Sequence, residues 1–110
     1  MKQYVIDQLR EPDYEAILDY LDKNAQKTAM EGVYRVQIPE DYYTSLQLDH
    51  ADCRPFYFAA VLDLRQVSFE LLVRSQERIR CNCIAYATAQ QREFILHFAD
   101  NMLDELGIRI

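Results

Sequence analysis

Glycine, proline and histidine are all scarce in this sequence. The 110 residues include two glycines, three prolines, two histidines and no tryptophan. Two glycines far apart cannot build the glycine-rich loop that cradles nucleotide phosphates, so a nucleotide site of that kind is excluded. No run of about 18 apolar residues is present, which excludes a hydrophobic stretch long enough for a transmembrane helix.

The three cysteines are an odd number, so they cannot all pair in disulfides within one chain. An odd count is typical of proteins that stay in a reducing compartment. The first ten residues place Asp7 and Arg10 where a signal peptide requires an apolar stretch. We therefore predict a cytoplasmic protein.

The charge balance is acidic, with 18 acidic and 12 basic residues and a net charge of −6. A negatively charged surface repels phosphates and anionic lipids, which argues against binding to nucleic acid or to a membrane. Half of the residues are hydrophobic, which provides enough apolar side chains for a core. We expect a single α+β domain over residues 1–110.

Two segments show the apolar spacing of amphipathic helices. The first starts at Pro12, which suits the first turn of a helix, and its apolar residues recur up to Ala25. The second starts at Thr88, which forms a capping-box pattern with Gln91, and it ends at Gly107. These segments are the predicted N-terminal and C-terminal helices.

Between the helices the apolar period changes to two, which predicts β-strands. Strands are expected over residues 33–38 and 45–50, and a three-stranded meander over residues 56–87. The meander has one continuous apolar face, so the other face meets water. We therefore predict a two-layer sandwich, a mainly antiparallel sheet of about five strands with both helices packed on one face.

Two parts of this assignment stay open. Residues 1–10 fit a helix or a strand equally well. The turn at Arg65 and Gln66 lacks the glycine or asparagine of a tight hairpin, so it is either a hairpin or a bulge in one continuous strand. In the meander, the odd-numbered residues from Phe69 to Ala85 are expected to face the helices.

The cysteines and one histidine make up the ligand set of a Cys₃His zinc site, namely His50, Cys53, Cys81 and Cys83. However, the meander places Cys81 and Cys83 on the core face, where free cysteine packs as a small hydrophobe. We therefore predict no metal and no cofactor, with the zinc site as an alternative. Thiol chemistry at Cys53, beside Arg54, is a further alternative, but no family signature surrounds it. No catalytic residue is assigned, and we do not expect an enzyme.

The outer face of the predicted sheet carries a group of arginines. The expected register places Arg74 opposite Arg78, with Arg80 beside them and Tyr57 across the strand. Like charges opposite one another are destabilising, so they require acidic neighbours or an acidic partner. Nearby glutamates could neutralise them, and otherwise the face suits a protein carboxylate, a phosphate or nucleic acid.

Tyrosine is abundant, with eight residues in the chain, and Tyr42 and Tyr43 lie in a polar loop. Tyrosine is enriched at binding hot spots, although a loop tyrosine can equally close the edge of a core. We therefore predict a non-enzymatic protein-interaction domain, such as an adaptor, an inhibitor or a chaperone-like regulator. Its partner is a foreign protein or a second copy in a homodimer. The predicted partner-binding residues are Tyr42, Tyr43, Tyr57, Arg74, Arg78 and Arg80.

Overall fold

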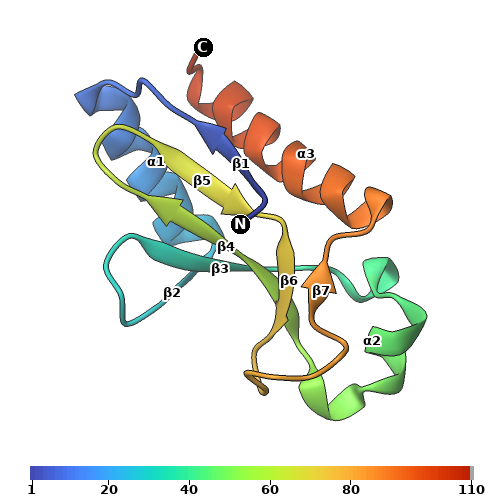
Figure 1. The fold of residues 1–110 in the computed structure, drawn as a ribbon. Helices are drawn as coiled ribbons and strands as arrows, with labels where there is room; N and C mark the ends of the chain where they lie inside the picture. The colour runs from blue at the N-terminus through green and yellow to red at the C-terminus, as the bar shows by residue number, and fades with distance from the viewer. Residues whose placement is uncertain (110) are drawn as a thin grey trace.

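The computed structural model describes residues 1–109, which form an α+β sandwich (Figure 1). The strands are Gln3–Ile6 (β1), Gln26–Lys27 (β2), Val33–Gln37 (β3), Phe56–Leu62 (β4), Val67–Glu70 (β5), Leu72–Ser75 (β6) and Ala85–Tyr86 (β7). The α-helices are Glu11–Asn24 (α1), Ser45–Asp49 (α2) and Ala89–Leu106 (α3). Two short 3-10 helices cover Glu40–Tyr42 (η1) and Ala51–Cys53 (η2). Residue 110, the last of the expected domain, lies outside the described residues.

All of the strand pairs in residues 1–109 are antiparallel, as predicted. The sheet runs in the order β1-β5-β4-β3-β2, while β6 pairs with β4 and β7 pairs with β6. Ala60 lies opposite Phe69 and Tyr57 lies opposite Arg74, so β5 and β6 pair with successive parts of β4. The two-residue strands β2 and β7 help to bring the described total to seven, where about five were expected.

Helices α1 and α3 cover the same face of the sheet, as the apolar pattern predicts. Phe58 of β4 packs edge-on against Phe94 and Phe98 of α3, with ring centroids 6.4 and 5.8 Å apart. Tyr34 of β3 donates a 2.7 Å hydrogen bond from its hydroxyl to Asp22 of α1. The core therefore lies between the sheet and these two helices.

The predicted ends of α3 are confirmed. The Thr88 hydroxyl accepts a 3.1 Å hydrogen bond from the Gln91 backbone N–H, and Gln91 Oε1 accepts a 3.2 Å bond from the Thr88 N–H. Gly107 follows the helix with a φ of +67°, a left-handed conformation that glycine adopts without strain. Along residues 1–109, no helix is both long and apolar enough to cross a membrane.

The turn at Arg65 and Gln66 is a hairpin, and residues 3–6 are a strand. The Asp63 N–H donates to the Gln66 carbonyl at 2.9 Å, and Asp63 Oδ1 accepts bonds from the N–H groups of Arg65 and Gln66 at 3.0 and 3.1 Å. The Asp63 carboxylate thus stabilises a turn that lacks glycine and asparagine.

The predicted strand over residues 45–50 is wrong, because this segment contains the short helix α2. The Thr44 hydroxyl accepts a 3.1 Å hydrogen bond from the Gln47 N–H, and Gln47 Oε1 accepts a 3.0 Å bond from the Thr44 N–H. This second capping box starts a helix and outweighs the strand-like alternation of Leu46 and Leu48.

The predicted third strand of the meander is also wrong for most of its length. Residues 76–84 form a loop, and only Ala85–Tyr86 pairs with β6. The expected odd-residue parity holds up to Ser75, beyond which Ile79, predicted in the core, is 95% exposed. Because the strand ends at Ser75, the predicted opposition of Arg74 and Arg78 does not form.

Candidate metal centre

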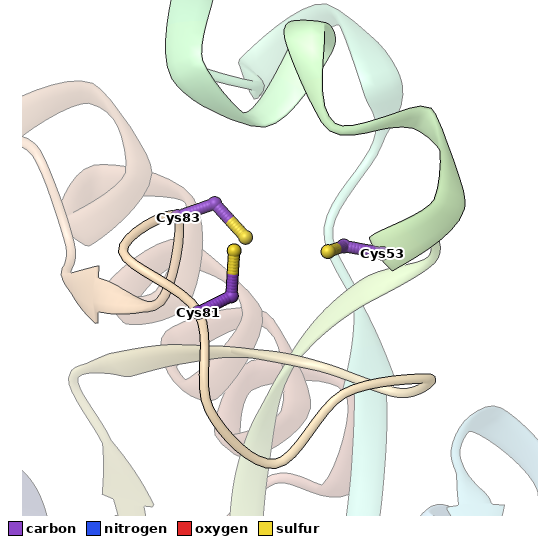
Figure 2. A group of neighbouring side chains, drawn as sticks. All are labelled: Cys53, Cys81 and Cys83. Atoms are coloured by element: carbon purple, nitrogen blue, oxygen red, sulfur yellow. The ribbon is translucent and has the colours of Figure 1, made fainter.

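The two wrongly predicted segments meet at one end of the sheet, where α2 and η2 lie beside the loop over residues 76–84 (Figure 1). Together they bring the three cysteines into one cluster. The sulfur atoms of Cys53, Cys81 and Cys83 all lie within 4.8 Å of one another, and none forms a disulfide. Figure 2 shows the Cys81 and Cys83 sulfurs pointing toward each other and the Cys53 sulfur pointing toward both.

Hydrogen bonds fasten the segment after β6 to the η2 turn that carries Cys53. The Ser75 hydroxyl donates to the Cys53 carbonyl and accepts bonds from the N–H groups of Glu77 and Arg78, at 3.2 and 3.0 Å. The Arg78 guanidinium also forms a 2.8 Å ion pair with Asp52. These contacts fix the point where the loop leaves the sheet. Glu77 lies at this point, four residues before Cys81.

A buried pair of glutamines anchors the other end of the loop. Gln47 Nε2 donates to the Cys83 carbonyl at 3.4 Å, and Gln91 Nε2 donates to Gln47 Oε1 at 3.0 Å and to the Tyr42 carbonyl at 2.9 Å. Both side chains are almost fully buried, and both glutamines occupy the N3 position of a capping box. The backbone at Cys83 is therefore held by the N-terminal ends of α2 and α3, and a bonded buried network of this kind favours one arrangement.

The three thiols have different environments. A hydrogen bond from the Cys83 backbone N–H is the main cause that lowers the pKa of Cys81, with further bonds from the Cys83 and Cys53 thiols and the charge of His50. Burial raises the pKa of the Cys83 thiol to about 12. The cluster thus favours a thiolate at Cys81 first, and a bound cation would stabilise the thiolate form of all three.

His50 has a hydrogen bond that prepares its ring to act as a ligand. It lies at the junction of α2 and η2, three residues before Cys53, and its Nδ1 is 2.7 Å from the Leu46 carbonyl oxygen. A carbonyl accepts only, so Nδ1 carries the proton and Nε2 keeps its lone pair. Metal-bound histidines commonly donate their other ring nitrogen to a backbone carbonyl in this way. When the ring is protonated instead, its positive charge lowers the pKa of Cys81.

The three cysteines of the alternative ligand set are thus brought to one place, although by loops and not by a strand. Their three sulfurs lie within 4.8 Å of one another, whereas His50 is outside this group and acts on Cys81 only through its charge. Three thiolates and one imidazole make a donor set suited to tetrahedral zinc.

The tyrosines of the predicted partner-binding set lie against the core. Tyr42 packs on Phe94 with ring centroids 5.1 Å apart, and Tyr43 packs edge-on against Phe56 at 5.0 Å. The Tyr43 hydroxyl also accepts a 3.2 Å bond from the Phe56 N–H. Both rings are half-buried, so they close the edge of the core, which was the alternative interpretation of this pair.

The remaining members of that set are divided between the sheet and the loop. Tyr57 and Arg74 are opposite one another on β4 and β6. Arg78 lies in the loop and pairs with Asp52, and Arg80 is an exposed loop residue. The structure therefore keeps Tyr57 and Arg74 together and separates Arg80 from the sheet.

Sequence reasoning missed Gln47 and Ser75, which position the cluster. Gln47 could have been found, because Thr44 and Gln47 repeat the capping-box spacing recognised at Thr88 and Gln91. Ser75 carries no such signal, since its contact with the Cys53 carbonyl joins residues far apart in sequence. No protein family model, curated protein or solved structure matches this chain.

Proposed function

We propose that this chain is a small zinc-binding domain that acts by binding a partner protein and not by catalysis. The observation that carries the proposal is the convergence of three sulfurs within 4.8 Å from two loops. Tetrahedral zinc with bonds of about 2.3 Å to sulfur requires neighbouring sulfurs about 3.8 Å apart. The observed separations of up to 4.8 Å exceed that spacing by about 1 Å at most, so the proposal requires only small side-chain rotations.

The identity of the metal follows from the donor atoms. Thiolate sulfur is a soft ligand that selects zinc over calcium and magnesium, which bind oxygen. We assign the fourth position to Nε2 of His50, which would have to move toward the three sulfurs when the ion binds. The other ring nitrogen is already bonded to the Leu46 carbonyl, as is common for metal-bound histidine. Zinc bound in this way links η2 to the loop that carries Cys81 and Cys83.

A closed set of four protein ligands supports a structural role. Catalytic zinc sites keep one position open for water or substrate, whereas structural sites use all four. The domain would then act as an adaptor, an inhibitor or a chaperone-like regulator, with the ion holding its loops in place. Three free cysteines support a cytoplasmic location, where thiols stay reduced.

Metal analysis tests the proposal. The protein is purified under reducing conditions, loaded with zinc, freed of unbound metal and measured for zinc and protein content. We expect one zinc per chain. Cobalt substitution should give the sulfur-to-cobalt charge-transfer bands of a tetrahedral thiolate site.

Single substitutions identify the ligands. Cys53→Ser, Cys81→Ser and Cys83→Ser should each abolish stoichiometric zinc binding, and His50→Ala should weaken it at least about tenfold. His97→Ala is the matched control, because His97 is an exposed histidine on α3, and it should bind zinc like the wild type. Zinc-free wild-type protein, or equal zinc content in Cys81→Ser, would contradict the proposal.

Cys81 supports a second candidate function, in which its thiolate acts as a nucleophile. It is half-buried, and its lowered pKa increases the thiolate fraction. Iodoacetamide labelling with and without zinc separates the two functions. Zinc binding predicts protection of Cys81, and fast labelling that zinc does not slow favours the nucleophile.

A further inference from the structure

The face of the sheet away from the helices carries a groove. Alternate residues of β4 are buried beneath the helices, so Tyr57, Ala59 and Val61 face outward. With the hairpin between β2 and β3 they line a cavity of about 570 Å³. Val33 lies opposite Val61 in the sheet, and Met30 of the hairpin, 68% exposed, lines the same cavity, so this end of the groove is apolar.

The other end of the groove is basic. A second hollow of about 170 Å³ shares Arg35, Tyr57 and Arg74 with the first. The Arg35 guanidinium lies 5.0 Å from the centre of the Tyr57 ring and forms no ion pair with any residue from 1 to 109. Arg74 donates to a single carboxylate oxygen of Glu70, at 3.3 and 3.4 Å. Of these two guanidinium groups, only that of Arg74 is paired with a carboxylate.

We propose that this groove binds an extended segment of a partner protein in which an aspartate or glutamate lies close to a bulky apolar residue. The carboxylate would pair with Arg35 and Arg74, since guanidinium binds carboxylate in a planar, two-pronged geometry. The apolar side chain would cover Val33 and Val61. The inference rests on the partner binding in the proposed function and names the chemistry of the partner.

Charge complementarity is the argument for an acidic segment. The groove is lined by three arginines and by Glu70 and Glu77; Arg74 pairs with Glu70 and Arg78 with Asp52, so Arg35 is the lining cation without a carboxylate among residues 1–109. The chain as a whole carries −6, so most of its surface repels an acidic peptide, while Arg35 attracts one. Nucleic acid fits less well, because Glu70 lies among the arginines and the apolar end offers nothing to a phosphate backbone.

The loop that leads to the cysteines forms one wall of the basic hollow. Its residues 76–79 line the hollow, and Cys81 follows two positions later. Ile79 is 95% exposed at this wall and adds an apolar contact for the bound segment. A metal that fixes Cys81 would therefore also fix the shape of the groove.

Selection from a library of displayed random short peptides tests the proposal with zinc-loaded protein. Enriched peptides are synthesised and their affinity is measured by fluorescence anisotropy. The test variant combines Arg35→Glu with Arg74→Glu, and a second combines Arg35→Gln with Arg74→Gln in case charge reversal disturbs the fold. The control combines Arg65→Glu with Arg92→Glu, which changes the same charge at exposed positions outside the groove.

We expect the enriched peptides to share a carboxylate beside an apolar residue. Charge reversal should weaken their binding at least about tenfold and neutralisation about fivefold, while the control should stay within about twofold. The proposal is overturned by no enrichment, by peptides without a carboxylate, or by equal binding to the reversed variant. It is also overturned if single-stranded DNA or a second copy of the chain occupies the groove in place of the peptides.

Zinc content measured on the same samples separates this inference from the metal site. Zinc-loaded protein that enriches no peptide overturns the groove proposal and leaves the metal site intact. If the protein binds peptides but holds no zinc after it has been incubated with zinc, the metal site is overturned and the groove proposal stays intact.

Discussion

Two regions of this molecule are held together by different kinds of contact. The sandwich region, strands β1 to β6 with α1 and α3, depends on fully buried apolar side chains such as Phe58, Phe69 and Ile95. The loop region, residues 39–55 and 76–87, packs a few side chains such as Tyr43 and Cys83 on the edge of that core and is positioned by single polar contacts from Gln47 and Ser75. Apolar burial is distributed over many side chains, whereas each polar contact is made by one atom pair. The loop region should therefore loosen through single substitutions that leave the sandwich region folded.

Phe58→Ala should have the largest effect, because it removes a fully buried ring that packs on two rings of α3. We expect the free energy of unfolding to fall by about 3–5 kcal/mol. Urea denaturation followed by circular dichroism measures the change. Leu64→Ala is the control, because Leu64 is 69% exposed, and it should change stability by less than about 0.5 kcal/mol. A fall in the free energy of unfolding of less than about 1 kcal/mol for Phe58→Ala would contradict the claim that buried apolar side chains stabilise the sandwich region.

Gln91→Leu should come next, since it leaves the Tyr42 carbonyl without its side-chain donor and removes one of the two hydrogen bonds to the buried Gln47 Oε1. The expected cost is about 2–3 kcal/mol. Amide hydrogen exchange should become faster throughout the loop region and change little in β4 and β5. Gln90→Leu, at an exposed position of the same helix, is the matched control. Uniform acceleration in both regions would show that they unfold as one unit.

Gly32→Ala tests the hairpin of the sandwich region. Gly32 has a φ of +80°, and an added Cβ would lie 2.5 Å from the Leu62 carbonyl oxygen. Strain and steric overlap together should cost about 2 kcal/mol. At Gly107, φ is +67° but, apart from its chain neighbours, no atom of residues 1–109 lies within 4 Å of the added Cβ, so Gly107→Ala should cost only about 1 kcal/mol. Equal melting temperatures for the two variants would contradict the close approach at Leu62.

Tyr34→Phe should have the smallest effect at neutral pH, about 1 kcal/mol, through loss of the bond to Asp22. Burial, with the Asp22 carboxylate, raises the pKa of Tyr34 to about 12. The fold therefore favours the protonated phenol, and this stabilisation is complete below pH 10 and is lost as pH rises toward 12. The urea midpoint of unfolding should fall less between about pH 9 and about pH 11 in Tyr34→Phe than in the wild type. An identical fall in both proteins would exclude Tyr34 as the source.

The sequence predicted the sandwich region because its apolar residues repeat over long segments. The alternation around Tyr34 and Val36 and the helical stripe of α3 each depend on many positions. Segment 45–50 has only Leu46 and Leu48 as apolar signals, and two positions cannot separate a strand from a one-turn helix. The Thr44 and Gln47 spacing was the informative feature of that segment.

The candidate site was only partly predictable. The four candidate ligand residues were recognised, but Ile79, Cys81 and Cys83 alternate as a strand would, so they were assigned to the core. Cysteine packs as a hydrophobe and also binds metal, and residue type alone does not separate these roles. The decision depends on contacts between distant residues, such as Ser75 with Cys53, which leave no periodic pattern.

X-ray absorption at the zinc edge of the loaded protein tests the central claim most directly, because it reports the atoms bound to the ion. Three sulfur neighbours at about 2.3 Å and one nitrogen at about 2.0–2.1 Å are the predicted first shell. A shell made only of nitrogen and oxygen atoms would contradict the account, because it would place the ion away from Cys53, Cys81 and Cys83.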